Sequence, residues 1–314
     1  MPEEADTSNV QKIVFTGLDN AGKSSIILSM LRELSKIATI KPTRNAERRF
    51  FEFLGMKISE WDLGGQESFR KSYLEKAHLI FQGTDVLIYV VDVQDHDRIV
   101  DSCSYLNEVV KKFVELELEP SIHVFFHKYD GDDGKMVPDA KMEKTIEFLK
   151  NKISSFQNYE KFSFHKTTVF NLSTIVNAMS ELLIKLYPKA LLIDTTIQEF
   201  ADKCEAKGVE LLDDNSLIIS SYYEDPSIER ILNGLSPFFL KLNDGFDDID
   251  GVEEHKNYVT VERLGKFFIF KRFKLLRGSS PYYLLLCKDD PSFNKEEFDV
   301  LANLLNEILS QDLA

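Results

Sequence analysis

The stretch GLDNAGKSS, which begins at Gly17, has the residue types and spacing of a phosphate-binding loop. It matches the pattern G-x-x-x-x-G-K-[ST], in which backbone N–H groups face phosphate oxygens and a following helix adds its positive end. Lys23 would reach the outer phosphates, and the Ser24 hydroxyl would bind Mg²⁺. The motif predicts a nucleotide site formed by Asp19, Asn20, Ala21, Gly22, Lys23, Ser24 and Ser25.

A second motif, WDLGGQESF, begins at Trp61 near the end of a predicted strand. Asp62 is placed to hold a magnesium-bound water, as the second phosphate-side carboxylate does in P-loop NTPases. Gly65 can present its backbone N–H to a terminal phosphate because it carries no side chain. Gln66 would orient the attacking water while Lys23 offsets the charge that develops, so both are predicted to act in catalysis together with Gly65.

Thr43 lies in the segment IKPTRN, between the first predicted helix and the second predicted strand. A loop threonine in this place would reach Mg²⁺ and the terminal phosphate in one nucleotide state and release them in the other. We therefore predict that Thr43 contributes to metal binding, nucleotide binding and catalysis. Thr39 is a nearby competitor for the same position.

The stretch FFHKYD ends an apolar run with His127, Lys128 and Asp130. An ionised Asp130 would accept from the ring N–H and exocyclic amine of guanine, a donor pair that adenine lacks. The Lys128 stem would lie along the base. His127 would either donate to the base as an asparagine amide does or only brace the phosphate loop, and the sequence leaves both open.

The surrounding pattern predicts the elements that position these residues. Apolar runs indicate strands at 11–16, from Val86, from Ser121 and, more weakly, at TTVFN near Thr167, while 50–53 and 57–61 form a hairpin. Helical periodicity lies between them at 24–35, 106–116, 139–156 and 172–186. Buried strands that alternate with helices predict an α/β fold with a mostly parallel sheet, helices on both faces and ligands at the carboxyl ends of its strands.

The pattern changes after Tyr187-Pro188. A helix at about 196–207 precedes the strands VELL and SLIISSYY, a helix from Pro226 to about Asn243, three further strands and a final helix at 295–309. This α-β-β-α-β-β-β-α order predicts a second, α+β domain. We place domain boundaries at 10–190 and 191–314, and we expect the acidic segment 244–254 to be an exposed loop.

GLDNAGKSS, Thr43, WDLGGQ and an x-K-x-D box follow one another in the order of the Ras-like small GTPases. WDLGGQ, its spacing from Thr43, and the P-loop residues Asp19 and Asn20 resemble the Arf group. HKYD, and FHKTTVFNLS with Thr168 and Val169 at its centre, resemble the Rag/Gtr GTPases, which carry a C-terminal roadblock domain of matching element order.

The resemblance implies a P-loop small-GTPase domain followed by a roadblock-like, longin-like domain. It implies that Thr168 and Val169 belong to the base-contacting loop, with GTP/GDP and Mg²⁺ as ligands. It also implies a homodimer or heterodimer through the second domain, regulation by a GAP, a GEF or scaffold proteins, and a switch or scaffold role at membranes in nutrient signalling.

Composition excludes several other classes. The formal net charge is −14 and the pI about 5.0, so overall charge does not drive binding to nucleic acid or anionic lipid. No run of 18 apolar residues is present, the acidic start MPEEADTSNV does not resemble a signal peptide, and Pro2 excludes myristoylation. Three widely spaced cysteines indicate a reducing compartment. We expect a cytoplasmic protein that reaches membranes only through a partner.

Three functions fit the sequence to different degrees. We favour a GTPase switch with slow turnover that needs a partner, because no arginine finger in cis is evident, although Arg44 lies in the first switch. A nucleotide-binding assembly scaffold, or pseudo-GTPase, with negligible hydrolysis is the alternative, and Gln66 disfavours it. An ATPase conflicts with Asp130.

Overall fold

A computed structural model describes residues 10–30, 34–37, 39, 41–43, 45–130, 140–156, 159–247, 258–275 and 280–310. The chain divides into two compact units, Met1–Ala178 and Met179–Ala314. The division falls inside the helix α7 (Leu172–Leu186), earlier in the chain than the boundary near residue 190 that the sequence pattern suggested. Each unit has its own sheet.

The described part of the first unit contains a six-stranded sheet in the order β2-β3-β1-β4-β5-β6. The strands are β1 (Val10–Gly17), β2 (Ala46–Phe53), β3 (Met56–Leu63), β4 (Val86–Asp92), β5 (Ser121–His127) and β6 (Phe162–Thr167). Only the edge pair β2–β3 is antiparallel among these ladders. This topology confirms the predicted α/β fold with a mostly parallel sheet.

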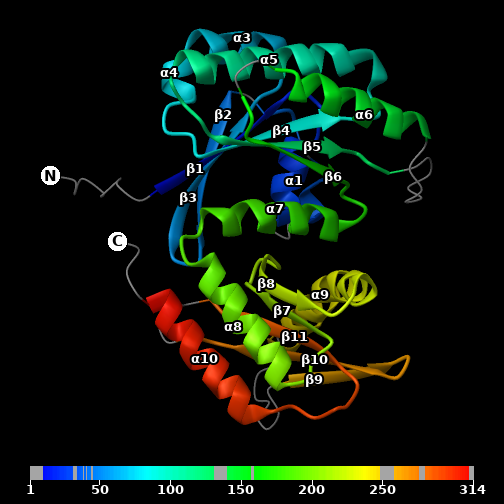
Figure 1. Cartoon of the computed structure of the whole chain (residues 1–314). Helices are drawn as coiled ribbons and strands as arrows, with labels where there is room; N and C mark the ends of the chain where they lie inside the picture. The colour runs from blue at the N-terminus through cyan, green and yellow to red at the C-terminus, as the bar shows by residue number, and fades with distance from the viewer. Residues whose placement is uncertain are drawn as a thin grey trace, which may run out of the picture. The chain divides into compact units, whose positions relative to one another are not determined.

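Helices cover both faces of this sheet (Figure 1). One face carries α3 (Glu67–Glu75), α4 (Ala77–Ile80), α5 (Ile99–Glu115) and α6 (Ala140–Ser154), and the other carries α1 (Lys23–Met30) and α7. Since both faces are covered, β4 is buried from Val86 to Val91, which explains its unbroken apolar sequence. The carboxyl ends of β1, β3, β4 and β5 meet at one edge, where the predicted motifs lie.

Several predicted elements of the first unit differ from the structure. The strand expected at TTVFN was misplaced. Strand β6 is FSFHKT, which pairs with β5 and ends at Thr167, the first residue of TTVFN, and the chain then turns between Thr168 and Asn171. Of the first predicted helix, the structure describes α1 and the short α2 (Leu34–Ile37), and residues 31–33 lie outside the described residues. Helix α5 begins at Ile99, after the short helix η1 (His96–Arg98), well before the predicted start at Leu106. The helices α3 and α4 were not predicted.

The second unit contains, in its described residues, a five-stranded antiparallel sheet in the order β8-β7-β11-β10-β9. These strands are β7 (Gly208–Leu212), β8 (Ile218–Tyr223), β9 (Tyr258–Arg263), β10 (Lys266–Phe273) and β11 (Tyr282–Lys288). Helices α8 (Ala190–Lys203) and α10 (Lys295–Ser310) cover one face, and α9 (Pro226–Asp247) covers the other (Figure 1). The element order α-β-β-α-β-β-β-α is confirmed.

Two boundaries in this unit differ from prediction. Helix α8 occupies Ala190–Lys203 instead of 196–207, because Glu205 adopts a positive φ of 51° that ends the helix. Helix α9 continues to Asp247, so the first part of the predicted acidic loop is helical, and 248–254 lie outside the described residues. None of the helices in the described ranges is long and apolar enough to cross a membrane.

Candidate functional site

The loop between β1 and α1 has the backbone that its glycines predict. Gly17 has a φ of +143°, and a Cβ there would lie 2.3 Å from the Val90 carbonyl oxygen on β4. Gly22 has a φ of +99°, and Asn20 also adopts a positive φ, of 59°. The Gly22 carbonyl accepts from the Ile26 N–H at 3.0 Å, so the loop leads directly into the first turn of α1. This geometry presents the N-terminus of α1 to an anion.

Lys23 lies inside this loop with 6% of its surface exposed. Its Nζ donates to the carbonyl oxygens of Leu18 at 2.8 Å and Gly17 at 3.3 Å. Burial lowers the pKa of Lys23 to about 8, although the Asp62 and Asp19 carboxylates act in the opposite direction. An incoming phosphate would supply the negative charge that favours the protonated ammonium.

Ser24, Thr43 and Asp62 form a single hydroxyl–carboxylate cluster. Asp62 Oδ2 accepts from Ser24 Oγ at 2.6 Å and from Thr43 Oγ1 at 3.1 Å, and the two hydroxyls lie 2.9 Å apart. The competing Thr39 instead donates its hydroxyl to the Lys36 carbonyl. Three predicted ligands from three separate segments are therefore brought together.

The cluster fits a hard divalent cation such as Mg²⁺. Within the described part of the chain, the buried Asp62 Oδ1 has no hydrogen-bond partner. Burial raises the pKa of Asp62, whereas the Ser24 hydroxyl, the Lys23 cation and the Thr43 hydroxyl lower it. Because the pKa is raised on balance, the site stabilises an added positive charge beside this carboxylate. Hydroxyl and carboxylate oxygens are the donors that Mg²⁺ takes.

Gly65 and Gln66 follow at the start of α3. The Gly65 carbonyl accepts from the Asp19 N–H at 3.0 Å, and a Cβ on Gly65 would lie 2.2 Å from that nitrogen. Only glycine permits this approach to the phosphate loop. Gln66 is exposed at the N-cap of α3.

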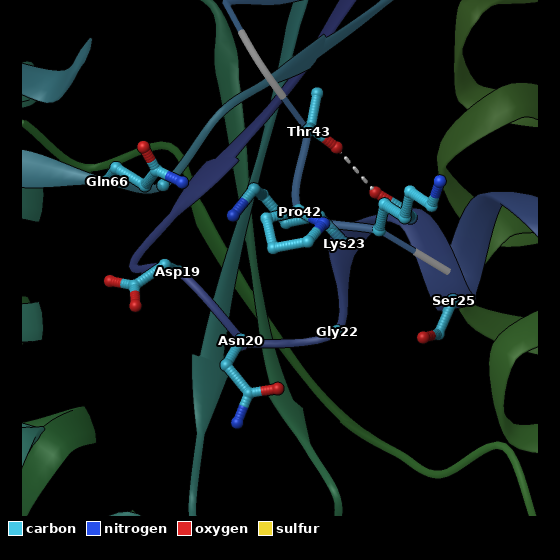
Figure 2. A pocket seen from close by; sticks show the side chains of 11 residues that line it. Asp19, Asn20, Gly22, Lys23, Ser25, Pro42, Thr43 and Gln66 are labelled. Carbon is cyan, nitrogen blue, oxygen red and sulfur yellow. Dashed lines mark hydrogen bonds between the residues drawn. The ribbon is translucent and has the colours of Figure 1, made fainter. Parts of the chain in front are cut away.

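The phosphate-side residues line one pocket (Figure 2). It includes Lys41 and Pro42, which the sequence did not single out. The other lining residues are Asp19, Asn20, Gly22, Lys23, Ser24, Ser25, Thr43, Gly65 and Gln66, whereas Ala21 is buried in the loop behind them.

The His127 ring lies against the phosphate loop at Gly22. Its ring is 2% exposed, and Cδ2 and Nε2 lie 2.4 and 2.7 Å from the point where a Cβ on Gly22 would stand. Its Nδ1 lies 3.0 Å from Thr167 Oγ1, at the end of β6. Burial lowers the pKa of His127 to about 4, and the neighbouring Lys128 cation adds to this, so the ring is neutral. The geometry favours the second of the two interpretations that the sequence left open.

Lys128 and Asp130 lie beside the loop that follows β6. Lys128 Nζ donates to Asp92 Oδ2 at 2.6 Å, and Asp130 Oδ1 accepts from Thr168 Oγ1 at 2.8 Å. The Thr168 hydroxyl also accepts from the Phe170 N–H, while the half-buried Val169 lies between them. The structure thus brings the x-K-x-D box and the Thr168 loop together.

Sequence reasoning missed four polar residues around this site. Asp92 and Gln94 contact the x-K-x-D box, Arg98 pairs with Asp19 at 2.5 Å, and Arg70 Nε donates to the Gly65 carbonyl at 2.9 Å. Each of these residues follows a motif or strand that was recognised, but a polar residue in such a position has no sequence pattern that identifies it as part of a site. Their partners are set by tertiary contacts.

A glycine loop with a buried lysine, a hydroxyl–carboxylate cluster and an x-K-x-D box, all at the carboxyl edge of a parallel sheet, define a P-loop nucleotide-binding domain of the small-GTPase class. The sequence matches the Gtr1/RagA G protein conserved region over residues 12–233. The chain belongs to this family, and membership implies guanine-nucleotide binding.

Two curated relatives agree with both resemblances noted in the sequence. A Ras-related GTP-binding protein A of Dictyostelium discoideum is 24% identical over 241 residues, which cover 73% of this chain and 77% of that protein. An ADP-ribosylation factor-like protein 3 of Chlamydomonas reinhardtii is 36% identical over 101 residues, covering 32% of this chain and 54% of that protein. The solved Arl6 (BBS3) small GTPase of Trypanosoma brucei is 20% identical, with a TM-score of 0.44, over 55% of this chain and 95% of its own.

Proposed function

We propose that the protein is a guanine-nucleotide switch that binds GTP and slowly hydrolyses it to GDP and phosphate with Mg²⁺. The observation that carries this is the cluster of Ser24, Thr43 and Asp62, with the buried Asp62 Oδ1 free to bind a cation. Thr43 comes from a loop outside the sheet, so its place in the cluster couples that loop to the occupant of the site.

Each residue of the phosphate side has a distinct task. Lys23 stabilises negative charge on the outer phosphates, and the Gly65 N–H faces the terminal one. Gln66, which lines the same pocket, orients the water for in-line attack. Bound Mg²⁺ would neutralise phosphate charge from the side of Ser24, Thr43 and Asp62. Loss of the terminal phosphate releases Thr43 and the Gly65–Gln66 segment.

Two arginines near the pocket, among the residues that the structure describes, favour slow intrinsic turnover; Arg44 lies outside the described residues. Arg98 is paired with the Asp19 carboxylate, and Arg70 donates to the Gly65 carbonyl. Both guanidinium groups are engaged in local contacts, so a partner is needed to supply further positive charge during hydrolysis. The same observation keeps a nucleotide-binding scaffold with negligible hydrolysis as the second candidate function.

Single-turnover hydrolysis of GTP separates the two candidates. We expect slow phosphate release by the wild-type protein and a further reduction in Gln66→Leu. Gln82→Leu is the matched control, because Gln82 is exposed but does not line the pocket. Equal, near-zero rates for wild type and Gln66→Leu at saturating GTP contradict the enzyme and favour the scaffold.

The second unit is proposed to form a homodimer or heterodimer as a roadblock-like domain. Its support is a row of exposed apolar side chains on α9, where Ile231, Phe238 and Leu242 are 37, 72 and 44% exposed at spacings that place them on one side of the helix. Exposed apolar rows of this kind mark association surfaces. Light scattering of wild type, Phe238→Asp and the control Val300→Asp, on the opposite helix layer, tests it. A monomeric wild type at high micromolar concentration contradicts the homodimer.

We further propose a cytoplasmic switch or scaffold in Rag-like signalling, recruited to membranes by a partner chain and regulated by a GAP or GEF. The support is family membership and the net charge of −14, which does not favour direct binding to an anionic bilayer. Binding of the purified protein to anionic vesicles without any partner contradicts recruitment through another chain.

A further inference from the structure

The segment that follows β4 contacts the x-K-x-D box from a different part of the fold. Asp92 Oδ2 accepts from Lys128 Nζ at 2.6 Å, and Asp92 Oδ1 accepts from the backbone N–H of Gln94 at 3.0 Å. One carboxylate therefore positions both the lysine of the box and the backbone of Gln94. This places the Gln94 side chain against the residues around Asp130.

The Gln94 amide reaches three acceptors at once. Its Nε2 lies 3.0 Å from the Lys128 carbonyl oxygen, 3.2 Å from the Asp130 carbonyl oxygen and 3.2 Å from Asp130 Oδ2. All three partners are oxygen acceptors, which settles that the NH₂ group and not the amide oxygen faces them. The two N–H donors of this side chain are therefore fully engaged although Gln94 is exposed.

The backbone of the box needs such support. Lys128 has a φ of +60°, in the left-handed region that a residue with a Cβ seldom adopts. The hydrogen bond from Gln94 to the Lys128 carbonyl stabilises this conformation. Because Asp130 follows two residues later, the conformation of Lys128 decides where the Asp130 side chain stands.

The two side-chain contacts on Asp130 leave part of its carboxylate open to a ligand. An ionised carboxylate has about four acceptor positions, two on each oxygen. Thr168 Oγ1 occupies one on Oδ1, and Gln94 Nε2 occupies one on Oδ2. Among the described residues no other donor occupies these oxygens, so one position on each remains for the two adjacent donors of guanine. Rotation of an aspartate about its terminal torsion is otherwise broad, so tethers on both oxygens hold the plane of the carboxylate.

We propose that Gln94 is a positioning residue for guanine recognition, which acts by holding the Asp130 carboxylate in the plane that its two base contacts require. This rests on the guanine-nucleotide switch proposed above. Without the Gln94 amide, the Thr168 hydroxyl is the remaining described side-chain tether on Asp130, and the carboxylate rotates about it. The contact to the exocyclic amine and the contact to the ring N–H then no longer form together.

Equilibrium competition with GDP and IDP, on the full chain with Mg²⁺, tests the proposal. Inosine keeps the ring N–H of guanine and lacks the exocyclic amine, so it makes one contact to Asp130 where guanine makes two. Gln94→Met keeps the length of the side chain and removes the donors. We expect about tenfold weaker binding of GDP and a smaller loss for IDP, so the preference for GDP over IDP shrinks several-fold. Gln82→Met is the matched control and keeps the wild-type preference.

A second variant, Gln94→Glu, places a carboxylate against Asp130 and two carbonyl oxygens. We expect it to weaken the binding of GDP more than Gln94→Met does. Unchanged affinity for GDP in both variants overturns the role of Gln94, and so does a loss of affinity by the same factor for GDP and IDP. A wild-type protein that does not prefer GDP to ADP contradicts the guanine switch itself. The two failures are therefore distinguishable.

Discussion

The contact between Gly22 and His127 allows a quantitative test of how the phosphate loop is held. In Gly22→Ala, the new Cβ would lie 2.4 and 2.7 Å from Cδ2 and Nε2 of the His127 ring. The ring cannot move aside easily, because it is buried and its Nδ1 is bonded to Thr167. Overpacking of this kind costs about 1–3 kcal/mol. The φ of +99° adds about 1–2 kcal/mol for an L-residue.

Together these contributions predict that Gly22→Ala lowers the free energy of unfolding by about 2–5 kcal/mol. Removing the ring with His127→Ala relieves the overpacking but not the backbone strain. The double mutant is therefore expected to be about 1–3 kcal/mol more stable than the sum of the single changes predicts. Urea denaturation of the nucleotide-free protein, followed by circular dichroism, measures all four corners of the cycle.

Gly55→Ala is the matched control for backbone strain. Gly55 has a φ of +80°, and among the described residues no heavy atom lies within 4 Å of an added Cβ. Gly55→Ala should lower the free energy of unfolding by about 1–2 kcal/mol, and by the same amount in the wild-type and His127→Ala backgrounds. Strict additivity of Gly22→Ala and His127→Ala would refute the reasoning, because it would mean that the ring does not lie against the loop.

Three further outcomes follow from the same structure. The pKa of His127 is lowered to about 4 in the folded protein, so the unfolded chain takes up this proton first and the free energy of unfolding falls as pH falls from about 6.5 to 4. In urea titrations at fixed pH, the free energy of unfolding of His127→Asn should fall by up to about 3 kcal/mol less over this window than that of wild type. EDTA should accelerate GDP release from wild type in a fluorescent-nucleotide assay, and Asp62→Asn should remove most of that acceleration, since the negative charge of the cation site is lost. Gly234 lies in α9, and among the described residues no heavy atom lies within 4 Å of an added Cβ. Gly234→Ala should therefore raise the free energy of unfolding by about 0.5–1 kcal/mol in thermal or urea melts.

Prediction from the sequence succeeded where the signal is local. The strands β1, β4 and β5 were recognised because strands covered on both faces read as unbroken apolar runs. Strand β6 was misplaced because its burial is only partial, so FSFHKT carries weak apolar character beside the more suggestive TTVFN. The start of α5 was missed because its first two turns, IVDSCSY, consist of residue types with low helix propensity.

The motifs by themselves determined the class of ligand and the side of the sheet where it would bind. A glycine loop before a helix, a carboxylate after a strand and an x-K-x-D box carry their chemistry in residue types and spacing. Thr43 could be named but not chosen over Thr39, since both lie in one loop; the structure places the Thr43 hydroxyl 3.1 Å from Asp62 Oδ2.

Only the tertiary structure decided which side chains hold the phosphate loop and the x-K-x-D box in place. Whether His127 faces a base or the phosphate loop depends on how β5 packs beside the loop after β1, and those segments are more than a hundred residues apart in the sequence. The contacts of Gln94 to Asp130 and of Arg98 to Asp19 likewise join loops at the ends of different strands. Spacing along the chain records local geometry, whereas contacts between strand ends are set by strand order and register, which the sequence pattern does not specify on its own.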